Sequence, residues 1–359
     1  MMWRPYQSLI VGVMGGLILL GCASVKVVES GAQLFPFPHV SNYQQLVSVY
    51  WLSSLLEFQA TGDHRTRPPT YEADHFVILE ASWGPLEKAR HYRSGHIPGA
   101  IHINTDDFEN GSPRWRLRSV AELQRVIGDH GISPESTVIV YGEQLIAAAR
   151  VWWILKYAGV EDARLLDGGF GAWKAAGLPV ETTIRRPRAT AFAAEAKRGY
   201  LATNEHVASH LDDGTLWLGD VRSEAEFSGT KSGYSYLDAK GRIPGAIHLG
   251  DADDKKRIYC RQNGFLRDPS EILSLWQDHG ILPDGTVPQG AELILYCGGG
   301  WRSSLAFFYA ALLGLENVRN YSDGWSGWST VYQPDGEAKG STPGWRQDST
   351  PNPRENGAP

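Results

Sequence analysis

A cysteine in a glycine-rich turn is the residue of this sequence best suited to chemistry. Cys297 opens the run CGGGWRSS (residues 297–304), between an apolar segment at 293–296 and another at 305–313. A turn from a strand into a helix directs backbone N–H groups and the positive helix end at the thiol, which favours the thiolate. We interpret Cys297 as the nucleophile of an enzyme; a buried structural cysteine is the alternative.

The residues after Cys297 could hold a ligand. Three successive glycines fill no core, so they let backbone N–H groups converge on a bound group. Arg302 would steer an anionic substrate, or else pair with a carboxylate. Trp301 would form a wall at the mouth of the pocket or pack against a domain formed by the first half of the chain. The predicted substrate-binding residues are Gly298, Gly299, Gly300, Trp301, Arg302 and Ser303.

The second half of the chain repeats the first. The segment HIPGAIH at 96–102 returns as RIPGAIH at 242–248, and DHGI at 129–132 returns at 278–281. Such a repeat indicates two copies of one domain. Each copy alternates apolar strands with helices, which predicts an α/β fold with a small parallel sheet flanked by helices. Ligands bind at the carboxyl ends of such strands, where Cys297 lies. His102 and His248 occur in both copies, which favours a structural role.

The extent of the repeated segments predicts the limits of the two domains. We assign one domain to residues 41–183, a linker to 184–199 and a second domain to 200–332. Residues 333–359 are rich in Pro, Gly, Ser and Asp without periodicity, which predicts a disordered tail.

Residues 1–21 are expected to be an export signal. The apolar stretch 9–20 is shorter than the roughly 20 residues of a membrane span, which favours a signal peptide. The sequence LLGC at 19–22 resembles the bacterial lipobox, in which Cys22 would carry lipid. Ala23 after it implies sorting to the outer membrane. We therefore expect a periplasmic, lipid-anchored protein; a cleaved signal or a plain N-terminal anchor is the alternative.

Composition excludes some functions. The formal net charge of −6 gives no electrostatic basis for nucleic-acid binding. Three cysteines, Cys22, Cys260 and Cys297, show no metal-ligand spacing. We therefore expect neither a metal nor a cofactor. A Cys260–Cys297 disulfide would block the turn, so Cys260 is interpreted as a bystander.

Several motifs together resemble the rhodanese family over about residues 41–330. They are Ile-Pro-Gly-Ala in both copies, Asp220-Val221-Arg222 at a strand end, Cys297 with Arg302, and Asp-Gly-Trp at 323–325. The resemblance implies two rhodanese-like domains, of which the second is catalytic. It also implies sulfur transfer through a persulfide on Cys297. Asp220 and Arg222 would form an ion pair that braces the loops without touching substrate.

The first copy is expected to be inactive. Aligning the helices of the two copies places Gly142 opposite Cys297, and Glu143 where an anion would bind. Like charge repels an anionic donor. The first copy would then cover one wall of the second copy's site.

The loop also bears on the substrate. Four residues separate Cys297 from Arg302, whereas cysteine phosphatases and related arsenate reductases resemble Cys-x5-Arg, so sulfur is favoured over phosphate or arsenate. Thiosulfate-type members resemble CRKGVT and mercaptopyruvate-type members CG[S/T]GVT; this chain lacks the two loop cations of the first group. We expect thiosulfate, or a related anion, as donor and cyanide or a thiol as acceptor. The alternatives are a 3-mercaptopyruvate sulfurtransferase and a carrier that passes its persulfide to a protein partner without turnover.

Overall fold

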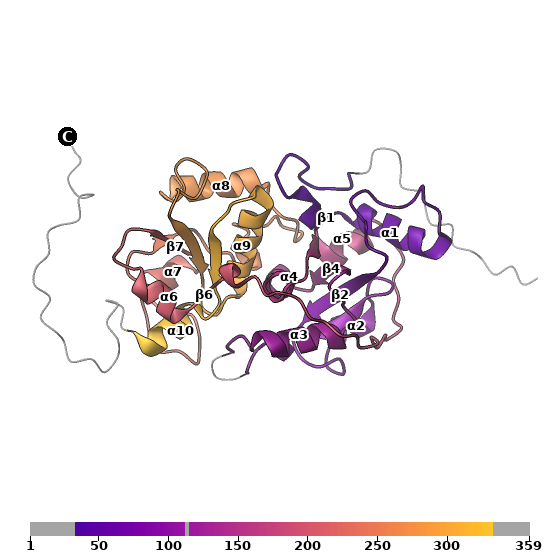
Figure 1. The fold of residues 1–359 in the computed structure, drawn as a ribbon, viewed down its shortest axis with the longest axis horizontal. Coiled ribbons are helices and arrows are strands. Elements are labelled where there is room, and N and C mark those ends of the chain that lie inside the picture. The colour runs from indigo at the N-terminus through magenta and orange to yellow at the C-terminus, as the bar shows by residue number, and fades with distance from the viewer. Residues whose placement is uncertain (1–32, 112–114, 333–359) are drawn as a thin grey trace, which may run out of the picture. The chain divides into compact units, whose positions relative to one another are not determined.

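The computed structural model describes residues 33–111 and 115–332 (Figure 1). The predicted signal, Cys22 and the predicted tail lie outside these ranges. In the described part of the chain, no helix combines the length and apolar character needed to cross a membrane.

The first copy of the repeat forms a five-stranded parallel sheet in the order β1-β5-β4-β2-β3. Its strands are β1 (Leu46–Val47), β2 (Phe76–Ser82), β3 (Ile101–Asn104), β4 (Thr137–Gly142) and β5 (Asp162–Leu166). Its helices are α1 (Val49–Thr61), α2 (Arg90–Ser94), α3 (Val120–Asp129), α4 (Leu145–Ala158) and α5 (Gly169–Ala175), with 3-10 turns η1 (Tyr43–Gln45) and η2 (Thr105–Phe108).

The second copy forms another five-stranded parallel sheet, in the corresponding order β6-β10-β9-β7-β8. Its strands are β6 (Leu201–Ala202), β7 (Leu216–Asp220), β8 (Ile247–His248), β9 (Glu292–Tyr296) and β10 (Val318–Tyr321). Its helices are α6 (Asn204–Ser209), α7 (Glu224–Phe227), α8 (Pro269–Asp278), α9 (Trp301–Leu313) and α10 (Gly324–Val331), with 3-10 turns η3 (Arg198–Tyr200) and η4 (Asp254–Lys256). The predicted fold class, two parallel sheets flanked by helices, is confirmed.

The central strands and the helices that follow them are buried because both are apolar throughout. β4 and β9 carry the near-continuous apolar runs VIVY and LILY, as expected for a parallel sheet covered on both faces. Helices α4 and α9 pack against each other, and most of their residues are buried. Each ends at a glycine in the left-handed conformation, Gly159 and Gly314. The two central strand-to-helix turns therefore each connect a buried strand to a buried helix.

The segment between the copies contains no helix or strand from residue 182 to 197. It is nevertheless hydrogen-bonded to the first copy. The Thr190 N–H donates to the Gly128 carbonyl (2.9 Å), and the Lys197 N–H donates to the Tyr157 carbonyl (2.9 Å). The connection thus follows the surface of α3 and α4.

Candidate active site

Cys297 lies at the carboxyl end of the central strand of the second sheet. It directly follows β9, and α9 begins at Trp301. The residue is only 1% exposed, yet it lines a cavity of about 580 Å³. Both copies of the repeat contribute walls to this cavity. The lining residues are Trp83, Asp106, Glu109, Trp115 and Ile146 from the first copy, and Ser223, Glu226, Lys231, Gly233, Tyr234, Tyr236, Asp251, Asp253, Lys256, Cys297, Gly299, Trp301 and Arg302 from the second.

The three glycines of the turn have different roles. Gly300 precedes α9 with φ 85°, and a Cβ there would lie 2.6 Å from Nη1 of Arg150. A Cβ on Gly298 would overlap the hydroxyl of Tyr234, whereas a Cβ on Gly299 would meet nothing within 4 Å. Packing therefore requires the first and third glycines. The second leaves open space in the cavity that Cys297 lines.

Ser303 lies behind the thiol and is fully buried. Its hydroxyl is 3.6 Å from Sγ of Cys297 and 2.7 Å from Oδ1 of Asn320, and it can donate its single proton to either atom. Asn320 also donates from Nδ2 to the Ser304 hydroxyl (2.9 Å). Sequence reasoning missed Asn320. A comparison of the copies could have found it, because the strand register aligns this buried amide with the apolar Leu165.

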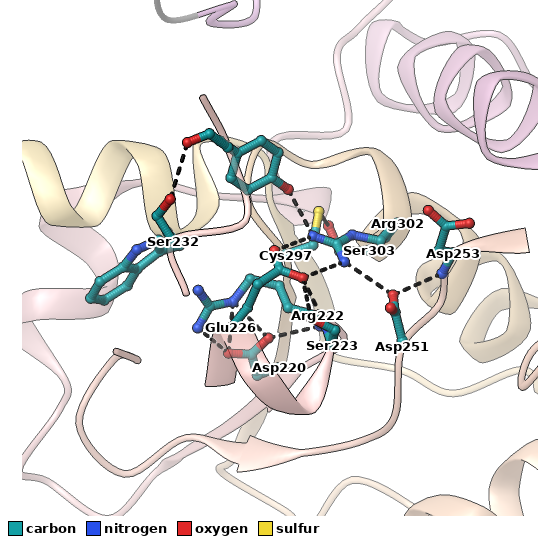
Figure 2. A network of polar contacts seen from close by, with 12 residues as sticks. Asp220, Arg222, Ser223, Glu226, Ser232, Asp251, Asp253, Cys297, Arg302 and Ser303 are labelled. Atoms are coloured by element: carbon teal, nitrogen blue, oxygen red, sulfur yellow. Dashed lines mark hydrogen bonds and ion pairs between the residues drawn. The ribbon is translucent and has the colours of Figure 1, made fainter. Parts of the chain in front are cut away.

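Arg302 is buried in a cluster of acidic and hydroxyl groups (Figure 2). Its Nη1 donates to Glu226 Oε2 (3.0 Å) and Asp251 Oδ1 (3.0 Å). Its Nη2 donates to Glu226 Oε1 (2.8 Å) and to the Tyr234 hydroxyl (2.8 Å). Of the two roles considered for Arg302, the geometry shows pairing with carboxylates. That it also binds substrate stays a prediction.

Glu226 carries a full negative charge in this cluster. Burial by itself would raise its pKa, but the Arg302 guanidinium and the hydrogen bonds from Ser223 outweigh burial and lower the pKa to about 2. Sequence reasoning missed Glu226, Asp251 and Tyr234. The sequence Ser223-x-x-Glu226 is typical of a helix cap, and the structure has that capping box, so nothing local pointed to a second partner.

Trp301 joins the turn to the first copy of the repeat. Its ring stacks on Trp83, with centroids 4.3 Å apart and planes at 4°, and its Nε1 donates to Glu109 Oε1 (3.1 Å). It also lines the cavity, so both roles considered for Trp301 are present.

A buried ion pair of the first copy reaches the same turn. Glu109 and Arg150, each 1% exposed, form a 3.0 Å ion pair. Arg150 also donates to the Ser322 hydroxyl (2.8 Å) and approaches the Gly300 carbonyl (3.5 Å). Burial raises the pKa of Glu109, and the charge of Arg150 opposes that rise. The first copy thus supports the turn as well as covering one wall of the cavity.

Asp220 and Arg222 form the expected ion pair. The closest oxygen and nitrogen are 2.6 Å apart, and both side chains are fully buried. Neither residue lines the cavity. Nε2 of His248 donates to the Arg222 carbonyl (2.7 Å), and Nε2 of His102 donates to the Gly84 carbonyl in the first copy (2.9 Å). Each histidine thus connects a strand to a loop within its own copy.

The first copy has Gly142 where the second has Cys297. The hydroxyl of Tyr141 accepts from the Ile97 N–H (3.3 Å), as that of Tyr296 accepts from the Ile243 N–H (3.3 Å). The two tyrosines are therefore equivalent, and so are the residues that follow them. Glu143 lies 3.0 Å from Nε2 of His91. Among the described residues, no three His, Cys, Asp or Glu side chains are grouped as metal ligands would be.

The rhodanese-like domain family matches residues 73–176 and 203–330. Thiosulfate sulfurtransferase YnjE of Escherichia coli is 36% identical over 305 residues, which are 83% of this chain and 66% of that protein, just under two thirds. The 3-mercaptopyruvate sulfurtransferase of Rattus norvegicus is 26% identical over 302 residues, 82% of this chain and 94% of that enzyme. The anaerobic ergothioneine biosynthesis enzyme from Chlorobium limicola has been crystallised with its natural substrate trimethyl histidine, and its sequence is 32% identical to this one. The two structures superimpose with a TM-score of 0.73 over 87% of this chain and 74% of that enzyme's chain.

The chain belongs to the rhodanese family, with two rhodanese-like domains. Its relatives are sulfurtransferases, so the class of enzyme is a transferase that moves sulfur.

Proposed function

We propose that this protein transfers a sulfane sulfur to a thiophilic acceptor through a persulfide on Cys297, with thiosulfate as the first donor to consider. The observation that carries the proposal is the position of Cys297, between the central strand β9 and the N-terminus of α9, in a cavity large enough for a small donor. The relative named for thiosulfate supports this donor.

The first step is attack of the Cys297 thiolate on the outer sulfur of the donor. The new S–S bond forms on Cys297, the donor's S–S bond breaks, and sulfite leaves with the electron pair. The backbone N–H groups of the first turn of α9 have no intrahelical partner, and no side chain caps them. They would stabilise the negative charge that spreads over the two sulfurs of the persulfide.

The second step returns the enzyme to its thiolate. An acceptor such as cyanide or a thiolate attacks the outer sulfur of the persulfide, and the electron pair of the S–S bond returns to Cys297. With cyanide the product is thiocyanate. Neither step needs a general base once the thiolate is present, because no proton is transferred.

Two alternatives concern the partner molecules. A 3-mercaptopyruvate donor is favoured by the absence of loop cations after Cys297 and by a relative of that name. A carrier that delivers its persulfide to a protein would form the same Cys297 adduct but show no turnover with small acceptors.

A second candidate function concerns the acceptor. The cavity has five aromatic walls, and one buried carboxylate oxygen of Asp106 has no hydrogen-bond partner among the described residues. Aromatic faces with carboxylates bind quaternary ammonium groups. An acceptor similar to trimethyl histidine, the substrate of the Chlorobium enzyme, would fit this lining. The aromatic residues are Trp83, Trp115, Tyr234, Tyr236 and Trp301.

Thiocyanate formation from thiosulfate and cyanide tests the proposed reaction. We expect turnover by the purified chain, loss of turnover to background in Cys297→Ser, and retained turnover in Cys260→Ser, because Cys260 does not line the cavity of Cys297. Equal turnover by Cys297→Ser and wild type would exclude Cys297 as the sulfur carrier.

We also propose that the protein is exported and anchored to the membrane by lipid on Cys22. The apolar stretch 9–20 and the motif LLGC at 19–22 support this proposal. Fractionation of cells that express the full chain or Cys22→Ala tests this proposal. The wild type should be found in the membrane fraction and the variant should not; the same distribution for both chains would contradict lipid anchoring.

A further inference from the structure

The guanidinium of Arg302 has no terminal N–H left for a substrate. Each of its terminal nitrogens carries two N–H bonds. Those of Nη1 are used by Glu226 and Asp251, and those of Nη2 by Glu226 and the Tyr234 hydroxyl. A donor anion could bond these nitrogens only by displacing a buried carboxylate or the tyrosine.

The cluster around Arg302 has a negative charge overall. Glu226 is 4% exposed and Asp251 is 7% exposed, and both carboxylates bond the one guanidinium. Glu226 remains ionised at any working pH, because its pKa is lowered to about 2 despite burial. The single positive charge of Arg302, which would attract an anionic donor, is therefore outweighed at the cavity wall by the two carboxylates of Glu226 and Asp251.

The remaining charges of the cavity do not reverse this sign near Arg302. Glu109 is balanced by Arg150. Asp106 and Asp253 add carboxylates, and the two lysines of the lining, Lys231 and Lys256, are exposed side chains. Solvent screens exposed charges more than buried ones. The two exposed lysines therefore offset less of the negative charge of the buried carboxylates than two buried cations would.

We propose that Glu226 and Asp251 determine the charge of the sulfur donor, so that the site accepts singly charged donors better than doubly charged ones. The inference rests on the proposed persulfide chemistry and adds a selectivity to it. Thiosulfate, a dianion, is then a donor with weak affinity. A donor of the thiosulfonate class, which carries one negative charge, is bound with a smaller electrostatic penalty, because the Coulomb energy is proportional to the charge of the donor.

Asp251→Asn is the variant that isolates this effect. Asp251 accepts from Nη1 of Arg302 and from the Asp253 N–H through the same oxygen, Oδ1. Asparagine keeps an acceptor at that position and removes one negative charge. The matched control is Asp129→Asn, which removes an equal charge from a carboxylate that is 52% exposed on α3. Thermal melting of both variants checks that they fold.

The two donors to compare are thiosulfate and methanethiosulfonate, in which a methyl group replaces one charged oxygen. Cys297 attacks the terminal sulfur of each, and the leaving group is sulfite or methanesulfinate, respectively. In Asp251→Asn we expect kcat/KM to rise about tenfold for thiosulfate and about threefold for methanethiosulfonate, following the ratio of their charges. The quotient of the two values should thus rise about threefold, and it should not change in Asp129→Asn. An unchanged or lower quotient in Asp251→Asn would overturn the inference.

A second measurement separates this inference from the proposed function. If wild type forms no persulfide with either of these donors, sulfur transfer from thiosulfate or a thiosulfonate fails as a proposal. The rates of Cys297 alkylation by iodoacetate, an anion, and by neutral iodoacetamide still report the local charge. The iodoacetate-to-iodoacetamide ratio should rise about threefold in Asp251→Asn. A constant ratio would show that these carboxylates do not select against anions.

Discussion

Gly298 shows at the scale of one residue how closely the turn is packed. The hydroxyl of Tyr234 occupies the position where a Cβ of residue 298 would lie, and the same hydroxyl accepts a hydrogen bond from Arg302. A side chain at position 298 must therefore displace Tyr234 and open the cluster around Arg302. Gly299, by contrast, faces open space.

Gly298→Ala should consequently reduce the rate of persulfide formation more than Gly299→Ala. We expect a loss of at least about tenfold for Gly298→Ala, since small displacements in a reactive site can cost up to about a hundredfold. Single-turnover persulfide formation, followed by mass spectrometry, measures both variants. Equal rates for the two alanine variants would show that Tyr234 does not constrain the turn.

The residues around Cys297 differ in how far the sequence could predict them. The turn itself is local, so a strand, three glycines and a helix were enough to predict the position of Cys297 between a strand and a helix. The partners of Arg302 are not local: Glu226 and Asp251 precede it by 76 and 51 residues. Only the folded sheet brings these loops together, and no periodic pattern indicates such a pairing.

At the scale of elements, helix α9 receives support from α4 of the first copy. Arg150 of α4 bonds the Ser322 hydroxyl beyond β10, and its partner Glu109 bonds the Trp301 indole at the start of α9. Arg150 of α4 and its partner Glu109 thereby connect the first copy to residues next to the turn that holds Cys297. This arrangement gives the first copy a function that its own sequence, with Gly142 and Glu143, does not show.

Removing one member of the Glu109–Arg150 pair should be far more costly than removing both. Arg150→Met leaves the Glu109 carboxylate buried without its counter-charge, a change that typically costs about 3–5 kcal/mol. The double variant Arg150→Met with Glu109→Gln carries neither charge, and its glutamine still offers an acceptor to Trp301. We expect the double variant to recover at least about half of the loss. Urea unfolding of the two single variants and the double variant measures the coupling; additive effects would contradict the ion pair's role.

The correspondence between the two strand orders could be anticipated from the repeat. Copies of one domain share a topology, and the two sheets do have corresponding orders. The very short edge strands β1, β6 and β8 have only two residues each, too few to give a periodic signal. Their places are decided by pairing with a longer neighbour in the folded sheet.

At the scale of the whole molecule, a buried carboxylate connects the two copies. Oδ1 of Asp167, which follows β5, accepts from the Leu266 N–H of the second copy (2.9 Å). Burial raises the pKa of Asp167 to about 7, and the hydrogen bonds from Leu266 and Gly168 and the charge of Arg261 oppose the rise without cancelling it. Below about pH 7 the Asp167 side chain therefore keeps its proton in the folded chain, whereas the unfolded chain releases that proton above about pH 4.

This proton makes stability depend on pH. Between about pH 4 and pH 7 the folded chain holds the proton of Asp167 and the unfolded chain does not, so the free energy of unfolding falls as pH rises through this window. Asp167→Asn keeps the acceptor for Leu266 and cannot ionise. Relative to this variant, wild type should lose about 2–4 kcal/mol between pH 4 and pH 8, because one pKa unit corresponds to about 1.4 kcal/mol. Denaturant unfolding at several pH values measures the difference. Parallel pH profiles for the two chains would mean that Asp167 is ionised in the fold.

The proposed sulfur transfer depends on a persulfide that forms on Cys297. The most direct measurement is the intact mass of the chain after incubation with thiosulfate and, separately, 3-mercaptopyruvate, without reductant. We predict a gain of about 32 Da, the mass of one sulfur bound to the thiolate. Cyanide should remove the gain, and Cys297→Ser should not show it. A chain that gains no mass with either donor, or a Cys297→Ser variant that gains the same mass, would show that Cys297 does not carry the sulfur.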